Sequence, residues 1–150
     1  MDLEQYLKEK EIKYRFIEKP QTIHTHDAAR LSGLELQRVT KNLVARTDSR
    51  NYVLLIIPGD RRVNLGKVRS LLKVENVSLA SFNEAEGISG YPPGGTPSIG
   101  HKTKMTTVMD RSLLNLGKVY CGGGSRHRLL ELRVEDIIRL SKPIIADILD

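Results

Sequence analysis

The chain has 150 residues, a single cysteine at Cys121 and a formal net charge of +6 at pH 7. This length suits one domain over residues 1–150, and the lone cysteine excludes an internal disulfide framework. No apolar run approaches the ~20 residues of a membrane helix, and the acidic start at residues 1–5 is unlike a signal peptide. We therefore expect a cytoplasmic protein with no membrane partner.

The first third of the chain predicts two helices around a short strand. An apolar stripe over residues 2–10 indicates a helix capped by Asp2, and alternation over residues 13–16 indicates a strand. A second helix follows a turn that begins at Thr22. We expect Thr25 to cap it, Gly33 to stop it, and its buried face to consist of Ala28, Ala29 and Leu31.

The strongest strand signal is a predicted hairpin. Residues 39–46 lead through a polar turn at 47–51 to residues 52–57, which are apolar on both faces. A turn at 58–60, a brief strand at 62–64 and a helix over 66–72 follow. Another short helix over residues 84–86 would be capped by Asn83.

The second half reads as strands separated by glycine-rich segments. Residues 87–100 hold too many glycines and prolines for a regular element and predict an ordered loop. Strands are predicted at 106–109, 118–121 and 129–132, with a break at 122–124, a helix over 134–140 and a packed tail at 144–149. Hairpins mixed with helices favour an α+β fold over a doubly wound parallel sheet.

Lys41 is the first candidate for chemistry. On a strand it would share its face with Val39, Leu43 and Ala45, all of them apolar. Such a lysine either extends to the edge of the apolar surface or sits in a pocket, where a desolvated ammonium usually has a task or a partner. The pattern leaves both interpretations open.

The two glycine-rich segments are the second candidate. Glycines at 90–100 and 122–124 let the backbone approach a ligand closely and present N–H groups to an oxyanion or a phosphate. A plain surface loop and a β-bulge are the alternatives. Asp110 follows an apolar strand, where it serves equally well as a helix N-cap. We expect Cys121 to be a small buried apolar residue.

The histidines do not make a metal centre. His24, His26, His101 and His127 have no carboxylate or cysteine at ligand spacing, so we expect no metal and no cofactor. The positive charge suits a polyanion such as RNA, or simply keeps a small protein soluble. The absence of Trp disfavours an extended base-stacking platform.

Six segments, taken in order, resemble the YbaK family, the free-standing relatives of the editing domain inserted in bacterial prolyl-tRNA synthetases. They are TIHT at 22–25 leading to AA at 28–29, TKNLV at 40–44, PGD and RVN at 58–64, GYPPGGTPSIG at 90–100, VMD at 108–110 and VYCGGG at 119–124. The resemblance covers residues 20–140. It implies a curved, mainly antiparallel, barrel-like sheet flanked by helices.

The resemblance also implies a function. A member of this family would hydrolyse the ester of a mischarged aminoacyl-tRNA in trans, here tRNA-Pro carrying Ala, Cys or Ser. Its partners would be the acceptor end of the tRNA and a synthetase, and not DNA. A non-catalytic tRNA- or synthetase-binding module with the same fold is the alternative, and a small-molecule-binding protein is a third.

The resemblance implies site residues position by position. The catalytic set would be Lys41, Gly94 and Gly95. The substrate-binding set would be His24, Thr25, Asn42, Pro97, Ser98, Gly100, His101, Asp110, Gly123 and Gly124. Ser98 stands where the family commonly has proline, which leaves the edited amino acid open.

Overall fold

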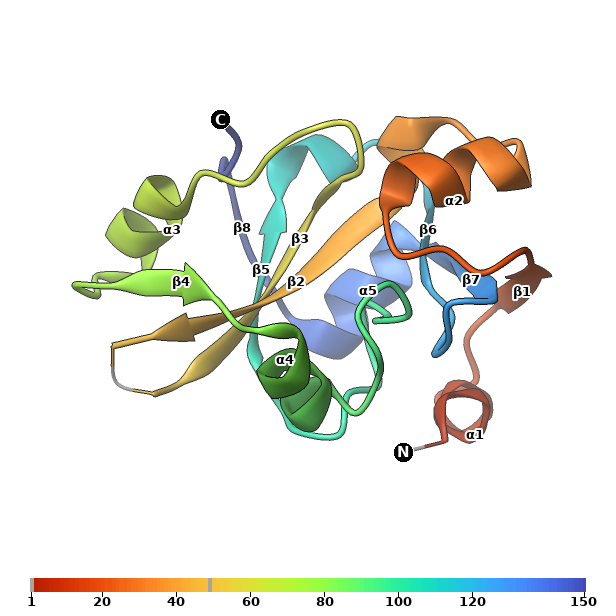
Figure 1. Cartoon of the computed structure of the whole chain (residues 1–150), viewed down its shortest axis with the longest axis horizontal. Coiled ribbons are helices and arrows are strands. Elements are labelled where there is room, and N and C mark those ends of the chain that lie inside the picture. Colours follow the sequence, from red (N-terminus) through yellow and green to blue (C-terminus); the bar gives the residue numbers. More distant parts are fainter. Residues whose placement is uncertain (1, 49) are drawn as a thin grey trace.

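Two β-sheets organise the chain in the computed structural model, which describes residues 2–48 and 50–150 (Figure 1). The α-helices are α1 (Leu3–Glu9), α2 (Thr25–Ser32), α3 (Leu65–Leu72), α4 (Phe82–Ser89) and α5 (Val134–Ser141). The strands are β1 (Tyr14–Glu18), β2 (Thr40–Thr47), β3 (Tyr52–Pro58), β4 (Val77–Leu79), β5 (Thr106–Asp110), β6 (Lys118–Gly122), β7 (Arg128–Arg133) and β8 (Ile144–Ala146). Single 3-10 turns occur at Leu36–Arg38 and Arg111–Leu113.

The larger sheet has the order β4-β2-β3-β5-β8. The predicted hairpin is confirmed, because β2 and β3 pair antiparallel with Lys41 opposite Ile57. Ser49, within the predicted turn, lies outside the described residues. The pairs β3–β5 and β5–β8 are parallel, so the sheet is mixed. Residues 53–57 are buried on both faces, as their continuous apolar run predicts.

The smaller sheet, of order β1-β7-β6, is antiparallel throughout. An isolated parallel bridge from Val39 to Tyr120, and a hydrogen bond from the Thr40 hydroxyl to the Tyr120 carbonyl at 3.4 Å, link it to the start of β2. The α+β class is confirmed, but the barrel-like closure is wrong. The described strands stay in two separate sheets, and the larger one is bounded by β4 and β8, each of only three residues.

Three apolar clusters hold the layers together. The main core lies between the sheets and is closed by α1 and α5, with Leu7, Leu54 and Ile137 fully buried. The opposite face of the larger sheet is covered by α3 and the C-terminal tail through Val68 and Ile148. The third cluster lies under α2, which covers one end of the smaller sheet (Figure 1). This arrangement places the start of α2 beside the start of β2.

Several local predictions are confirmed. Asp2 caps α1 by accepting a hydrogen bond from the Gln5 N–H, and Gly33 ends α2 at φ +68°. Cys121 is fully buried. Residues 90–100 form a loop tied down by hydrogen bonds, and no helix in the described ranges has the length and apolarity of a membrane span.

Other local predictions are wrong. His24 occupies the N-cap position of α2 without a side-chain bond, and the Thr25 hydroxyl instead donates to the Gly59 carbonyl at 3.4 Å. Helix α4 is capped by Ser81 rather than Asn83, because the Ser81 hydroxyl accepts from the Glu84 N–H, and the helix continues through Gly87 to Ser89. Leu31 is exposed rather than buried.

Candidate functional site

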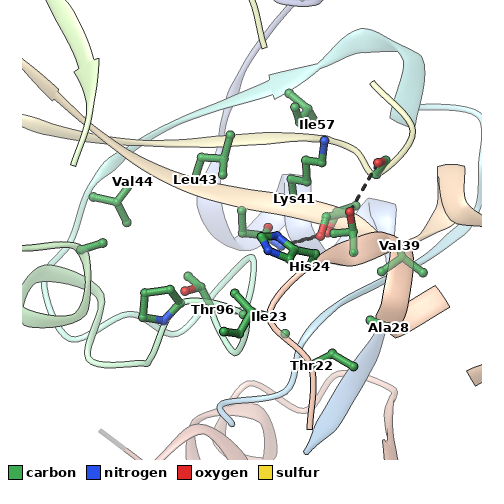
Figure 2. A pocket seen from close by; sticks show the side chains of 18 of the residues that line it. Thr22, Ile23, His24, Ala28, Val39, Lys41, Leu43, Val44, Ile57 and Thr96 are labelled. Atoms are coloured by element: carbon green, nitrogen blue, oxygen red, sulfur yellow. Dashed lines mark hydrogen bonds between the residues drawn. The ribbon is translucent and has the colours of Figure 1, made fainter. Parts of the chain in front are cut away.

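A cavity of about 630 Å³ opens where β2, the segment before α2 and the loop of residues 90–100, the glycine-proline loop, converge (Figure 2). Pockets for small ligands span roughly 300–1,000 Å³. Its lining residues come from segments far apart in the chain. They are residues 22–26 and 28; 39–44; 57, 59, 62 and 63; 79, 80, 82 and 85; 93, 94 and 96; and 122 and 129.

Lys41 enters this cavity from β2, which places it in a pocket rather than at the sheet edge. Its side chain is half-buried, and Nζ donates a hydrogen bond to the Arg61 carbonyl at 2.8 Å. Burial lowers the pKa of Lys41, the positive charge of Arg62 lowers it further, and the Asp60 carboxylate partly opposes both effects. Among the described residues, the Lys41 ammonium hydrogen-bonds to the Arg61 carbonyl and forms no salt bridge with a carboxylate.

Asn42 is oriented by hydrogen bonds from both sides. Its Nδ2 donates to the Thr40 hydroxyl at 3.0 Å, and the fully buried Ser98 donates from Oγ to Asn42 Oδ1 at 2.6 Å. Ser98 does not itself line the cavity. Its observed contact is with Asn42, so a change at this position reaches the cavity through the amide of Asn42.

A buried lysine fixes the wall made by residues 22–25. Lys19 is 8% exposed, and its Nζ donates to the Thr22 hydroxyl and to the Arg126 carbonyl, both at 2.6 Å. Arg126 in turn donates from Nε to the Pro93 carbonyl at 2.7 Å. These hydrogen bonds tie the wall before α2 to the glycine-proline loop.

At Gly94 the glycine-proline loop contacts the wall made by residues 22–25. Gly94 has φ +87°, and a Cβ built on it would lie 2.8 Å from the Ile23 Cα and 3.0 Å from the Thr22 carbonyl oxygen. The backbone N–H groups of Gly94 and Thr96 donate no hydrogen bond to any residue in 2–48 or 50–150. Both residues line the cavity, and an amide donor without an intramolecular acceptor is available to a ligand.

The other predicted glycines lie behind this wall. The N–H groups of Gly95, Gly123 and Gly124 donate to the carbonyls of Pro92, Arg128 and Gly95. Gly122, which does line the cavity, donates to Thr96, and a Cβ there would lie 2.3 Å from the Gly95 carbonyl carbon. These glycines let the loop and the β6–β7 connection pack backbone against backbone.

The remaining predicted residues also lie outside the cavity lining. His101 is half-buried, with Nε2 2.7 Å from the Pro97 carbonyl, and this contact holds the loop, while burial lowers the pKa of His101. Gly100, at φ +79°, packs against α1. Asp110 accepts hydrogen bonds from the N–H groups of Ser112 and Ile148 and from the Ser112 hydroxyl, which is the N-cap alternative.

Of the predicted site residues, five line the cavity together: His24, Thr25, Lys41, Asn42 and Gly94 (Figure 2 labels His24 and Lys41). Sequence reasoning missed Lys19, Arg62 and Phe82 as contributors. Arg62 could have been found, because it lies within the RVN motif at residues 62–64. The sequence gives no sign of Lys19 or Phe82, because the burial of Lys19 and the exposure of Phe82 follow only from packing.

The cavity is basic and offers no strong protein nucleophile. No Asp or Glu of the described chain lines it, whereas Lys41, Arg62, His24 and His26 do. No group of three or more metal-ligating side chains occurs in the described ranges. Burial raises the pKa of the Cys121 thiol to about 11, which keeps it protonated and inert. The arrangement suits binding of an anion and stabilisation of an oxyanion.

The chain is similar to proteins of tRNA charging and editing. The family model "Aminoacyl-tRNA editing domain" matches residues 19–140. The "Putative Cys-tRNA(Pro)/Cys-tRNA(Cys) deacylase EbsC" of Enterococcus faecalis is 25% identical over 135 residues, covering 90% of this chain and 82% of that protein. A "Proline--tRNA ligase" of Cupriavidus necator is 30% identical over 110 residues, covering 71% of this chain and 19% of the ligase.

A solved structure agrees with these sequence similarities. The "Crystal structure of a putative trans-editing enzyme for prolyl tRNA synthetase" superimposes with a TM-score of 0.89 at 25% identity, covering 99% of this chain and 94% of that one. The family match spans most of the chain and contains every residue that lines the cavity. The chain therefore belongs to the aminoacyl-tRNA editing domain family.

Proposed function

We propose that this protein is a trans-editing hydrolase that deacylates mischarged aminoacyl-tRNA, with the cavity as its active site. One observation carries the proposal: the cavity is lined by Lys41 and by Gly94 and Thr96, whose N–H groups have no acceptor among the described residues, and it contains no acidic side chain among its described lining residues. That composition suits a substrate with a phosphate backbone and an ester whose carbonyl becomes an oxyanion.

The reaction follows from these groups. Water adds to the ester carbonyl carbon, and the negative charge on the carbonyl oxygen is stabilised by the two amide N–H groups. The bond to the ribose oxygen then breaks, and that oxygen takes the proton lost by the water. Lys41 holds the nearby phosphate or offsets the developing charge. The ribose 2′-hydroxyl of the substrate is available to assist, so the reaction needs no triad of protein side chains.

We propose tRNA-Pro carrying Ala, Cys or Ser as the substrate. The names of the relatives, a Cys-tRNA(Pro)/Cys-tRNA(Cys) deacylase and a proline–tRNA ligase, support tRNA-Pro as the tRNA and Cys as one of the amino acids. Exclusion by size works best against larger side chains, because steric clash has no upper limit while a missing methylene is worth only ~1–3 kcal/mol. A synthetase that delivers the substrate is the expected protein partner.

The test is hydrolysis of tRNA-Pro charged with Ala, Cys, Ser or Pro, with buffer-only controls. We expect release of at least one non-cognate amino acid while prolyl-tRNA is spared. Binding of uncharged tRNA is measured in parallel on the same folded sample. Binding without hydrolysis of any ester would contradict the proposal and select the non-catalytic tRNA-binding module.

A further inference from the structure

Exposed apolar side chains border the cavity. Seven large hydrophobic residues of the described chain are exposed, and three of them, Ile23, Leu79 and Phe82, line the cavity. Phe82 is the most exposed of the seven, at 60%. An exposed phenyl ring forgoes the burial that stabilises a fold, and three exposed apolar side chains around one cavity favour a binding surface there.

Phe82 stands on a firmly held helix. It is the first residue of α4, directly after the capping Ser81. The Glu84 carboxylate accepts hydrogen bonds from the Tyr52 hydroxyl at 2.6 Å and from Arg46 at 3.3 Å, which anchors α4 to the β2–β3 hairpin. On the same helix, Ala85 and Ile88 pack against the main core, whereas Phe82 is not among its members.

The two ends of the cavity differ in chemistry. The Ala80 N–H donates to the Val44 carbonyl at 2.9 Å, so the apolar lining residues Leu79, Ala80 and Phe82 lie on the Val44 side of the cavity. Lys41, three residues earlier on β2, lies at the other end, where the charge of Arg62 acts on it. A ligand that fits both ends carries a flat apolar group joined to a negatively charged group. A nucleotide has this composition, and aromatic side chains bind bases by stacking on their faces. The volume of about 630 Å³ leaves room for more than the side chain of Ala, Ser or Cys.

We infer that Phe82 is the stacking residue for the terminal base of the RNA 3′ end, with Leu79 beside it. The Lys41–Arg62 end then takes the phosphate of the same strand. The inference rests on the proposed function, because it places the acceptor end of the tRNA in this cavity. A single aromatic residue serves one base, which agrees with the absence of an extended stacking platform in a chain without Trp.

The test compares Phe82→Ala, Phe82→Trp and Leu114→Ala. Leu114 is a matched control, since it is exposed, apolar and outside the cavity lining. The substrates are an alanyl-tRNA, alanyl-adenosine and the alanyl ester of glycerol, which has no base. We expect Phe82→Ala to raise KM on the order of 5- to 100-fold for the first two, from the loss of one stacked base. Its kcat, and hydrolysis of the glycerol ester, should stay within about twofold.

Phe82→Trp gives an independent readout of binding. It restores a stacking face and introduces a single tryptophan into a chain that has none. We expect quenching of its fluorescence by a CCA trinucleotide and none by ribose 5-phosphate. Circular dichroism of each variant confirms folding.

Three results would overturn the inference. They are an unchanged KM for alanyl-tRNA in Phe82→Ala, an equal loss with the glycerol ester, and indole fluorescence of the Phe82→Trp variant that does not respond to CCA. The second result would assign Phe82 to the amino-acid side chain instead. If the wild type hydrolyses no ester, the proposed function fails, while the fluorescence titration still decides whether Phe82 meets a base.

Discussion

Replacing Gly94 by alanine should push apart the two walls of the cavity. Gly94 has φ +87°, which costs an L-residue roughly 1–2 kcal/mol. The new Cβ would also lie 2.8 Å from the Ile23 Cα, and overpacking of this kind costs about 1–3 kcal/mol. The free energy of unfolding should fall by about 2–5 kcal/mol. At ~3 °C per kcal/mol for a chain of this size, Tm should fall by about 6–15 °C.

Two other glycines serve as controls that distinguish the cost of backbone strain from the cost of a steric clash. Gly33 has φ +68° with nothing within 4 Å of a built Cβ, so Gly33→Ala should cost only the strain of about 1–2 kcal/mol. Gly87 lies within α4, also with nothing within 4 Å, so Gly87→Ala should raise stability by ~0.5–1 kcal/mol.

Thermal and urea unfolding of the three variants measure these costs, and deacylation is assayed well below the lowest Tm. Of the three variants, we expect only Gly94→Ala to lose activity while it is still folded, because the new Cβ displaces both the Gly94 N–H and the segment that contains Ile23. Equal destabilisation by Gly94→Ala and Gly33→Ala, with activity retained, would refute the close contact between the walls.

Three further predictions concern charged and buried groups. Lys41→Met should lower kcat/KM at least 100-fold. It should not lower the free energy of unfolding, because burial lowers the pKa of Lys41 in the folded protein, so the unfolded chain binds the proton of Lys41 more readily. The wild-type rate should accordingly decline with rising pH below the ordinary pKa of lysine, and a pH–rate profile of Lys41→Arg should lack that decline. Asp110→Ala should reduce the free energy of unfolding by about 3 kcal/mol in urea titrations, because three donors lose their acceptor, while turnover per folded molecule stays the same. Iodoacetamide should not alkylate Cys121 in the native protein, because burial raises the pKa of its thiol to about 11. Mass spectrometry should show an unmodified cysteine, and activity should be retained. Rapid alkylation with loss of activity would contradict this.

The parts of the fold that were predictable from sequence have strong local signals. The β2–β3 hairpin follows from a polar turn between apolar runs, and Asp2 and Gly33 act through short-range backbone chemistry. The parallel pairing of β5 with β3 and of β8 with β5 joins segments far apart in the chain. No local pattern specifies such pairings, so neither the mixed sheet nor its open edges could be derived.

The helix caps were predicted wrongly where more than one residue could occupy the N-cap position. At α2, Thr25 can cap in principle, but its hydroxyl reaches Gly59 in the neighbouring turn instead. At α4, Ser81 and Asn83 are both good caps by residue type, and the helix begins at the earlier one. Local propensity ranks Ser and Asn almost equally as caps, so residue type alone does not place the start of α4.

The candidate site was predictable as a set of segments but not residue by residue. Lys41 stood out because a charged residue interrupted an apolar face, and the structure places it in the cavity. Gly94 and Gly95 are indistinguishable by type, yet only Gly94 lines the cavity, and the Gly95 N–H donates to Pro92. Which amide remains unused depends on the folded loop, and so does the exposure of Phe82.

The most direct test of the cavity as a deacylation site is single-turnover hydrolysis of mischarged tRNA-Pro by the wild type and by Lys41→Met side by side. The wild type should release at least one of Ala, Cys or Ser and spare prolyl-tRNA. The variant should bind the same tRNA and lose that hydrolysis. Equal rates for the two folded proteins would contradict the assignment of the reaction to this cavity.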